Sequence, residues 1–462
     1  MTLIKSISGI RGTIGGQVGE NLTPIDAVKF AAAYGVWLKQ QRDKNSHKVV
    51  VGRDARISGK MMQSLVMNTL IGLGIDVVDV GLSTTPTVEV ATTLEHADGG
   101  VILTASHNPK QWNALKLLNA KGEFLDAIEG AKILEIAESD TMHFADVDNL
   151  GKITKNRAYI DLHIIEVLDL ELVTVKPIEE ARFRVVVDGV NSTGGIAIPL
   201  LLERLGVEVI KLYCEPNGHF PHNPEPLKEH LTDLSDAVKK HNADFGIVVD
   251  PDVDRLAFMD ENGEMFGEEY TLVACADYVL SRTPGNTVSN MSSTRALRDV
   301  TEKHGGIYEA SAVGEVNVVK LMKENNVVIG GEGNGGIIYP EAHYGRDALV
   351  GVALFLSLLA DKKMSVSELR KTYPNYFMSK KKIELTPTLD VDGILKNIVN
   401  RYKKEQLTTI DGVKIDFAES WVHLRKSNTE PIIRIYTEAK TQAEANDLAN
   451  KFITEIDEIA NL

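Results

Sequence analysis

The sequence contains very little cysteine. Cys214 and Cys275 are the only two among 462 residues, and their spacing does not pair them. A disulfide framework or a thiolate zinc site needs several suitably spaced cysteines, so both are excluded. We interpret the two thiols as core residues of a protein of the reducing cytoplasm.

Long apolar segments are also missing. The first residues, MTLIKSISGIRG, have no extended apolar core and do not follow the pattern of a signal peptide. The longest apolar helical stretch, Ala348–Ala360, is shorter than the roughly 18–20 residues that a membrane-spanning helix needs. We therefore expect a cytoplasmic protein that does not associate with a membrane.

Positive charge is in the minority. The chain has 50 Lys and Arg against 65 Asp and Glu, which gives a formal net charge of −15. Such a balance argues against general binding of nucleic acid. It does not exclude binding of phosphate ligands, because a site can be locally basic on an acidic protein. No feature indicates an obligate protein partner.

The sequence does contain a regular alternation of short β-rich runs and helix-length segments, and its length suggests three or four domains of roughly 100–200 residues each. Continuous apolar strands separated by helices are typical of α/β layers with buried, largely parallel sheets. We expect three similar α/β domains with mixed sheets and a smaller C-terminal α+β domain, at residues 1–150, 151–256, 257–372 and 373–462. The expected strands include Lys48–Val51, Asp76–Val80, Gly99–Thr104, Phe183–Asp188, Val207–Leu212, Phe245–Asp250, Gly306–Ala310, Val327–Gly330 and Ile432–Thr437, and the expected helices include Gly59–Leu73, Ala348–Ala360, Val391–Lys404 and Gln442–Ile459.

Ser106 follows a predicted buried strand, at the carboxyl end where α/β proteins place ligands. The neighbouring His107 suggests a serine hydrolase. However, the Gly-x-Ser-x-Gly elbow is absent, and adjacent side chains rarely face each other as nucleophile and base. Taken alone, Ser106 fits a helix cap before Pro109 better than a nucleophile. A catalytic serine here needs a partner from elsewhere in the chain.

Three aspartates at alternating positions, Asp250, Asp252 and Asp254, directly follow another predicted strand. Their carboxylates can converge on one hard cation. An EF-hand is excluded because Arg255 stands where that loop needs glycine, so Mg²⁺ is favoured over Ca²⁺. The alternative is a solvated acidic turn. The apolar flanks indicate burial, where three carboxylates without a cation would repel one another.

The segment Gly331–Gly336 formally matches the dinucleotide fingerprint Gly-x-Gly-x-x-Gly. A strand follows it where the fingerprint needs the start of a helix, so the match is weak. Glu332 and Asn334 on a glycine turn suit sugar hydroxyls better. A plain hairpin turn remains the alternative.

A basic segment near the C-terminus combines cationic, hydroxyl and amide side chains. Arginines and the backbone N–H groups of a turn can hold a phosphate dianion. The alternative is a polar hairpin with an exposed cationic rim. The candidate phosphate-binding residues are Arg425, Ser427, Asn428, Thr429 and Arg434.

These four loops, with the opening motif Ser8–Gly12, resemble the motifs of the α-D-phosphohexomutase family in the family's order. The matching segments are Thr104–Pro109 for the phosphoserine loop, Asp250–Arg255 for the metal loop, Gly331–Gly336 for the sugar loop and Arg425–Arg434 for the phosphate loop. The resemblance covers essentially the whole chain. It implies four domains around a central cleft, each contributing one loop.

The resemblance also implies a mechanism. Phosphorylated Ser106 transfers its phosphoryl group to a hexose monophosphate, and a hexose 1,6-bisphosphate reorients before the other phosphate returns to the serine. Charge neutralisation by Mg²⁺ supports such a transfer. The implied metal ligands are Ser106, Asp250, Asp252 and Asp254; the implied catalytic residues are Ser106, Lys116, Arg11 and His107; and the implied substrate-binding residues are Arg255, Glu332, Asn334 and the five of the phosphate loop. As an acid/base group, Lys116 would need a pKa lowered toward neutrality.

Some positions depart from the family pattern. The sugar loop commonly reads Gly-Glu-x-Ser-Gly-His, whereas Asn334 and Gly336 replace the serine and histidine here. The role of that histidine is unfilled unless His343 takes it over. The segment Gly52–Gly59 is similar to the branch that acts on glucosamine phosphates, which we favour as substrates. Mannose or glucose phosphates, a catalytically silent sugar-phosphate binder and a phosphatase with a phosphoserine intermediate remain alternatives.

Overall fold

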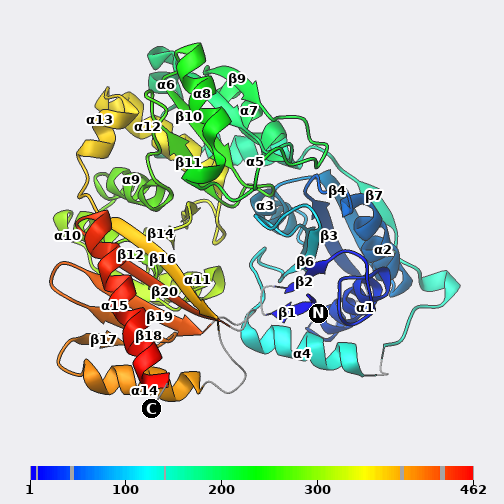
Figure 1. The fold of residues 1–462 in the computed structure, drawn as a ribbon. Helices are drawn as coiled ribbons and strands as arrows, with labels where there is room; N and C mark the ends of the chain where they lie inside the picture. The colour runs from blue at the N-terminus through cyan, green and yellow to red at the C-terminus, as the bar shows by residue number, and fades with distance from the viewer. Residues whose placement is uncertain are drawn as a thin grey trace.

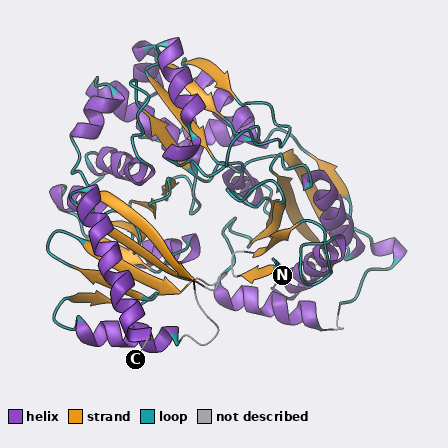
Figure 2. Cartoon of the chain, in the orientation of Figure 1, coloured by secondary structure: helices purple, strands orange, loops and turns teal. Residues whose placement is uncertain are grey.

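The computed structural model describes residues 2–6, 9–41, 46–139, 142–384, 390–426 and 432–460, with residue 460 described by its backbone alone. Four β-sheets, each accompanied by helices, form four domains that lie around a common centre (Figure 1). Helices cover the sheets of the first three domains, as the secondary-structure colouring shows (Figure 2). The expected architecture of three α/β domains and a smaller C-terminal domain is confirmed.

The first domain contains a seven-stranded sheet with the order β1-β2-β6-β5-β3-β4-β7. Strands β5, β3, β4 and β7 are parallel, whereas β6, β2 and β1 are added antiparallel. Its strands are β1 Ile4–Ser6, β2 Gly9–Thr13, β3 His47–Arg53, β4 Ile75–Leu82, β5 Gly99–Leu103, β6 Trp112–Leu118 and β7 Ile153–Lys155, and its helices are α1 Pro24–Gln41, α2 Gly59–Gly72, α3 Thr85–Leu94, α4 Ala127–Glu138 and the 3₁₀ turn η1 Val147–Asn149.

The second and third domains each contain a four-stranded mixed sheet, with the orders β11-β10-β8-β9 and β15-β14-β12-β13. The second consists of α5 Tyr159–Leu168, α6 Val175–Ala181, β8 Arg184–Asp188, α7 Gly194–Arg204, β9 Glu208–Leu212, η2 Lys228–His230, α8 Thr232–His241, β10 Phe245–Val249 and β11 Leu256–Met259. The third consists of α9 Glu268–Leu280, β12 Thr287–Asn290, α10 Ala296–Lys303, β13 Tyr308–Ser311, α11 Glu315–Glu324, β14 Ile329–Glu332, β15 Gly336–Ile338, α12 Ala348–Lys362 and α13 Val366–Lys371.

The same strand arrangement recurs in all three α/β domains. Part of the first sheet, β6-β5-β3-β4, has the order of the other two sheets. In each, a buried parallel strand ends in a loop and the chain returns antiparallel beside it, as β5–β6, β10–β11 and β14–β15. The predicted serine, aspartate and glycine loops are the turns of these three hairpins. The repeated topology therefore delivers three loops from equivalent positions.

The fourth domain is an antiparallel sheet with the order β16-β20-β19-β18-β17. Apolar residues of its two helices pack on the sheet, including Ile398 of the first helix and Phe452 of the second. This is the expected α+β domain. Its elements are β16 Phe377–Glu384, α14 Val391–Arg401, β17 Gln406–Thr408, β18 Val413–Asp416, β19 Trp421–Lys426, β20 Ile432–Ala439 and α15 Gln442–Ala460.

The second and third domains share one hydrophobic core, which extends from Ile160 to Tyr373 along the chain. Helix α12 runs through it and is buried at every residue from Ala348 to Ala360. A helix that is apolar on all sides must be covered on all sides, which explains this position. The rings of Phe258 and Phe355 stack there with centroids 3.7 Å apart. Within the described residues, no helix is long and apolar enough to cross a membrane.

Candidate active site

Ser106 lies in the turn between β5 and β6, in a strained backbone conformation. Its φ is 47°, in the left-handed region that residues other than glycine seldom adopt. Its N–H donates to Thr104 Oγ1 at 2.9 Å, and the Thr104 hydroxyl donates to Asp54 Oδ2 at 2.7 Å. The side chain of Ser106 is almost entirely buried. Surrounding contacts thus fix an unusual conformation, a feature that is common at functional sites.

Arg56 holds the serine loop in place. Its guanidinium donates to the backbone carbonyls of three loop residues, Ser106 at 2.5 Å, Asn108 at 2.6 Å and Pro109 at 2.8 Å. It also donates to the carbonyl of Trp112, at the start of β6, at 3.0 Å. Arg56 was not among the predicted site residues. Its position in the motif Gly52–Gly59 was the available signal, but the carbonyls that it binds are about 50 residues away along the chain.

The three aspartates converge in the turn between β10 and β11. Val253 has a φ of 65°, and this kink brings the alternating carboxylates to one side. The ligand oxygens of Asp250, Asp252 and Asp254 lie within 4.8 Å of one another, and all three side chains are fully buried. Burial, reinforced by the charges of Asp254 and Asp252, raises the pKa of Asp250. Three buried carboxylates this close need cationic partners.

This carboxylate cluster fits a hard divalent cation. Oδ1 of Asp252 and Oδ1 of Asp254 are buried and have no hydrogen-bond partner among the described residues. A buried acceptor without a partner costs free energy, so these two oxygens are suited to a metal ligand role. Oδ2 of Asp250 instead accepts a hydrogen bond from Ser106 Oγ at 2.5 Å.

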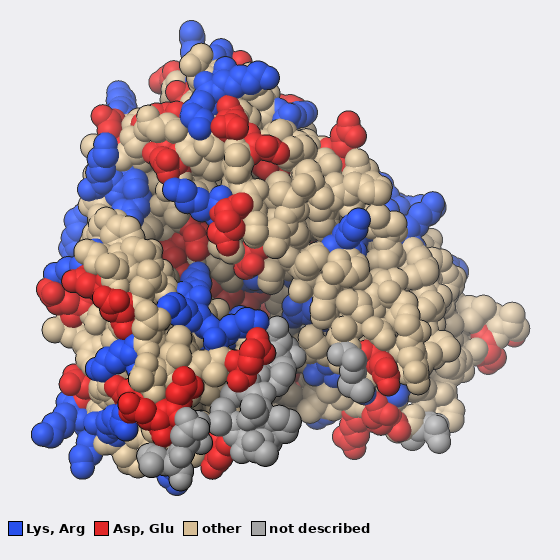
Figure 3. Space-filling view, viewed as in Figure 1, with Lys and Arg blue, Asp and Glu red and all other residues tan. Residues whose placement is uncertain are grey.

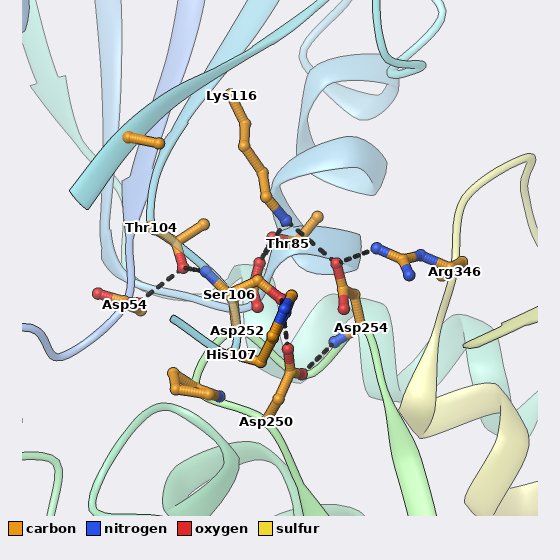
Figure 4. A network of polar contacts seen from close by, with 12 residues as sticks. Asp54, Thr85, Thr104, Ser106, His107, Lys116, Asp250, Asp252, Asp254 and Arg346 are labelled. Atoms are coloured by element: carbon orange, nitrogen blue, oxygen red, sulfur yellow. Dashed lines mark hydrogen bonds and ion pairs between the residues drawn. The ribbon is translucent and has the colours of Figure 1, made fainter. Parts of the chain in front are cut away.

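The serine and aspartate loops meet through side chains of the first domain (Figure 4). Thr85, at the start of α3, donates to Asp252 Oδ2 at 2.5 Å. Lys116, on β6, donates to Asp252 Oδ2 at 2.7 Å and to Asp254 Oδ2 at 3.1 Å. The ammonium group of Lys116 thereby partly compensates the charge of the cluster.

The pKa of Lys116 shifts in the direction opposite to the one expected. Burial lowers it, but the carboxylates of Asp252 and Asp254 outweigh burial and raise it above its usual value. The expectation of a pKa near neutrality is therefore wrong for the protein without bound ligands. The reason is the position of the lysine, which directly contacts two carboxylates.

His107 contacts the serine, contrary to the expectation for adjacent residues. Its Nδ1 lies 3.3 Å from Ser106 Oγ, because the left-handed turn at the serine brings the two side chains to the same side. Burial, reinforced by the charge of Arg255, lowers the pKa of His107 well below its usual value. This shift favours the neutral form of the imidazole.

Two further predicted residues lie next to these loops. Arg11, on β2, donates to Asn108 Oδ1 at 3.0 Å and so borders the serine loop. The backbone N–H of Arg255 donates to Asp250 Oδ1 at 3.1 Å, while its guanidinium donates to Glu225 at 3.2 Å. Both positions are consistent with their predicted places beside the phosphoserine and the metal loop.

In the glycine loop, Glu332 is buried and both of its carboxylate oxygens are engaged. Oε1 accepts from Asn290 Nδ2 at 2.8 Å and from the N–H of Gly314 at 3.2 Å. Oε2 accepts from Arg346 Nη1 at 2.9 Å. Asn334 Nδ2 lies 3.4 Å from the same oxygen. Sugar hydroxyls would therefore have to compete with donors that the protein already supplies.

His343 contacts two acidic side chains, Glu89 and Asp347. Its Nδ1 lies 3.2 Å from Glu89 Oε2, and its Nε2 lies 3.1 Å from Asp347 Oδ2. The same Asp347 oxygen lies 2.8 Å from His163 Nε2, and His163 Nδ1 lies 2.9 Å from Thr87 Oγ1. This cluster joins the first three domains. His343 is thus committed to an interdomain contact.

Arg425 and Arg434 face each other as cross-strand partners on β19 and β20. The strand end that carries them points from the fourth domain toward the first (Figure 1). Arg425 also forms an ion pair with Asp411 at 3.5 Å. The other predicted phosphate-binding residues, Ser427, Asn428 and Thr429, lie outside the described residues. Two of the five candidates are therefore adjacent in the structure.

The space-filling view shows a hollow between the domains, in which acidic side chains lie deep and basic side chains gather at the rim (Figure 3). This is the expected central cleft. A cation can bind to the carboxylates of such a site while the basic rim attracts anions.

Four family models match the chain in succession. Those of the phosphoglucomutase/phosphomannomutase alpha/beta/alpha domains I, II and III match residues 3–143, 159–263 and 267–376, and the C-terminal domain model matches residues 378–455. Together they account for most of the sequence.

Similar proteins of comparable length are known. A phosphoglucomutase/phosphomannomutase of Thermococcus kodakarensis is 37% identical over 94% of this chain and 96% of its own. A probable phosphoglucosamine mutase of Methanopyrus kandleri is 32% identical over 96% of both chains. The crystal structure of a phosphoglucomutase/phosphomannomutase family protein from Burkholderia thailandensis has a TM-score of 0.85 at 25% identity, covering 99% of this chain and 98% of that one.

Proposed function

The chain belongs to the phosphoglucomutase/phosphomannomutase family of phosphohexomutases. From this premise we propose that the enzyme moves a phosphoryl group between the oxygens of a hexose phosphate, and that Ser106 carries this group during the transfer. The observation that carries the proposal is the convergence of the serine and aspartate loops. Ser106 Oγ lies 2.5 Å from Asp250 Oδ2, although the two residues are 144 positions apart.

Asp250, Asp252 and Asp254 would hold Mg²⁺, with phosphorylated Ser106 as a further ligand. This assignment is supported by two buried oxygens, Asp252 Oδ1 and Asp254 Oδ1, which have no hydrogen-bond partner among the described residues, and by the mutual repulsion of the carboxylates. When bound, the cation supplies neutralisation of charge on the phosphoryl oxygens, on which phosphoryl transfer depends.

Side chains of the protein would carry out the proton transfer and orient the phosphate. The bond between phosphorus and Ser106 Oγ would break as a sugar hydroxyl forms a bond to phosphorus, and Lys116 would accept the proton of that hydroxyl. In this role its pKa would have to fall, as a cation held by the aspartates would cause by offsetting the carboxylates that raise it. The return step reverses these changes at the other end of the hexose 1,6-bisphosphate. Arg11 and neutral His107 lie beside the serine and would orient its phosphate. Neither has to serve as a hydrolytic base.

The fourth domain would bind the substrate at the phosphate that does not react. Arg425 and Arg434 present two guanidinium groups on neighbouring strands, and with Ser427, Asn428 and Thr429 they would bind the phosphate that does not react. Arg255, Glu332 and Asn334 would contact the sugar. Such a grip, which does not depend on which end reacts, allows the bisphosphate to bind in both orientations.

We favour glucosamine 6-phosphate and glucosamine 1-phosphate as the substrate pair. The segment Gly52–Gly59 supports this choice, as does the relative from Methanopyrus kandleri, which is named a probable phosphoglucosamine mutase. The relative from Thermococcus kodakarensis is named a phosphoglucomutase/phosphomannomutase, and this is the specific reason to keep glucose and mannose phosphates as the second candidate.

Coupled assays with each hexose phosphate, Mg²⁺ and the matching bisphosphate test the proposal. We expect turnover of glucosamine phosphate to exceed that of glucose and mannose phosphates. Ser106→Ala should abolish turnover while the fold is retained, whereas Ser64→Ala, at an exposed serine of α2, should leave it unchanged. Activity that survives in Ser106→Ala would refute the phosphoserine mechanism, and release of inorganic phosphate in place of isomerisation would indicate a phosphatase.

A further inference from the structure

Arg346 links three acidic segments around the site. It lies between β15 and α12 and is only 8% exposed. Its Nη2 donates to Asp254 Oδ2 at 2.7 Å, its Nη1 donates to Glu332 Oε2 at 2.9 Å, and its Nε donates to Glu315 Oε2 at 3.1 Å. One side chain therefore joins the metal loop of the second domain to the glycine loop and α11 of the third (Figure 4 shows its contact with Asp254).

Gly336 provides the space for this side chain. A Cβ atom at Gly336 would lie 2.3 Å from Arg346 Cδ and 3.1 Å from Arg346 Cγ. Real Cβ atoms do not approach other atoms this closely, so any larger residue at 336 would displace the arginine stem. Arg346 can therefore cross the glycine loop only because residue 336 has no side chain.

The hydrogen bonds of Asp254 show how Arg346 acts on the metal loop. Asp254 Oδ2 accepts from both Lys116 and Arg346, whereas Asp254 Oδ1 has no hydrogen-bond partner among the described residues. Arg346 therefore fixes one oxygen of this aspartate and leaves the other available. A separate N–H group of the planar guanidinium donates to Glu332 Oε2, whose other oxygen is held by Asn290 and Gly314. Lysine could not reproduce these two contacts in this geometry.

We propose that Arg346 is a positioning residue that couples the metal loop to the sugar-binding loop. It orients Asp254 for the cation and Glu332 for the sugar through a single rigid group, so occupancy of one loop influences the other. This inference rests on the proposed function, since it deepens the roles assigned there to Asp254 and Glu332. Partners that orient metal ligands commonly affect metal affinity or activity by about 10–100-fold.

The first test removes the guanidinium. In Arg346→Gln we expect kcat/KM to fall by about 10–100-fold and the Mg²⁺ concentration for half-maximal activity to rise. The KM for the sugar phosphate should rise in the same variant. Guanidinium ion added to Arg346→Ala should restore part of the activity. Arg370→Gln is the matched control, because Arg370 stacks on Tyr270 in the same domain without contacting the site; it should lower stability and leave these kinetic constants unchanged.

A double-mutant cycle tests the partnership with Gly336. Gly336→Ala should reduce activity in the wild-type background, because the new methyl group displaces Arg346. In the Arg346→Ala background the same change should alter activity by less than about twofold, since the obstructing stem is gone. Effects that simply add, or an Arg346→Gln variant that changes stability but neither the Mg²⁺ dependence nor kcat/KM, would overturn the proposal.

A measurement of Mg²⁺ binding distinguishes failure of this proposal from failure of the proposed function. The rise in melting temperature caused by Mg²⁺ can be measured without any substrate. If the wild-type protein converts none of the hexose phosphates, the proposed function fails. A smaller Mg²⁺-induced rise in Arg346→Gln than in the wild type and in Arg370→Gln would still support the coupling, and an equal rise in all three would refute it.

Discussion

Lys116 and Asp252 meet at 2.7 Å across the boundary between the first two domains. The lysine comes from the return strand of the serine hairpin, and the aspartate comes from the turn of the next hairpin. Because the contact joins charged groups that are largely buried, it ties the serine loop to the metal loop. The relative position of these domains and the charge of the site therefore depend on the same pair.

Replacing Lys116 by alanine should lower kcat by about 10²–10⁴-fold, the usual contribution of an acid/base group. It would also leave Asp252 and Asp254 without their shared ammonium partner. Steady-state kinetics at saturating Mg²⁺ provides the measurement. Lys110→Ala, at an exposed lysine of the serine loop, is the control and should retain full activity. A Lys116→Ala variant with near-normal kcat would exclude the acid/base role.

Magnesium should stabilise the protein through the aspartate loop. A ligand that binds only the folded state at a hundred times its dissociation constant adds ~2.7 kcal/mol to the free energy of unfolding. We expect Mg²⁺ to raise the melting temperature of the wild type, and Asp252→Asn to lose most of that increase. Asp260→Asn, which alters a turn after β11 outside the cluster, should keep it. An undiminished increase in Asp252→Asn would argue for a metal site elsewhere.

His343 and Glu89 should make stability depend on pH in the alkaline range. Burial lowers the pKa of His343, but Asp347 and Glu89 outweigh it and raise the pKa to about 10. Burial raises the pKa of Glu89 to about 8. Both groups bind protons more tightly in the folded state, so their stabilising contribution is complete below the unfolded pKa values and is lost as pH rises toward 10.

Urea denaturation at several pH values between 6 and 10 measures this effect. We expect the free energy of unfolding of the wild type to fall across that range, by ~1.4 kcal/mol for each tenfold difference in proton affinity that is realised. The double variant Glu89→Gln, His343→Gln lacks the titrating pair and should show a shallower fall. His143→Gln, at an exposed histidine, should follow the wild type. Equal slopes in all three proteins would mean that the pair does not titrate in this range.

Removing one ring from the shared core should destabilise the second and third domains together. Phe355 is fully buried and stacks on Phe258, which belongs to the other domain. Phe355→Ala should cost about 3–5 kcal/mol of unfolding free energy, as large-to-small changes in cores do. Phe144→Ala, at a ring that is 55% exposed, should cost little. Hydrogen exchange would follow each domain separately, and a loss of protection confined to the third domain would contradict the shared core.

The sequence was sufficient to predict the fold class and the loops that form the site. The predicted strands Gly99–Thr104 and Phe245–Asp250 placed Ser106 and Asp250 at carboxyl strand ends. The continuous apolar pattern of residues 348–360 predicted the helix that the structure buries. These features depend on local sequence. The sequence could not predict that Arg56 and Arg346 would organise the loops, because their partners lie 14 to 92 residues away along the chain.

Electrostatics was the least predictable property. The pKa of Lys116 depends on Asp252 and Asp254, which tertiary contacts bring to within hydrogen-bonding distance. The contact between Ser106 and His107 depends on a left-handed backbone at the serine, which no neighbouring glycine signals. In both cases the decisive factor is a backbone geometry or a distant charge rather than the residue type.

The continuous core of the second and third domains limits how the chain can be recombined. A chimera that exchanged one of these two domains with a relative would pair unrelated apolar surfaces around α12 and leave cavities or overlaps in the core. Residues 159–376 should therefore be exchanged as a single block. The fourth domain has a core of its own, so it can be replaced separately to test whether it binds the phosphate that we propose.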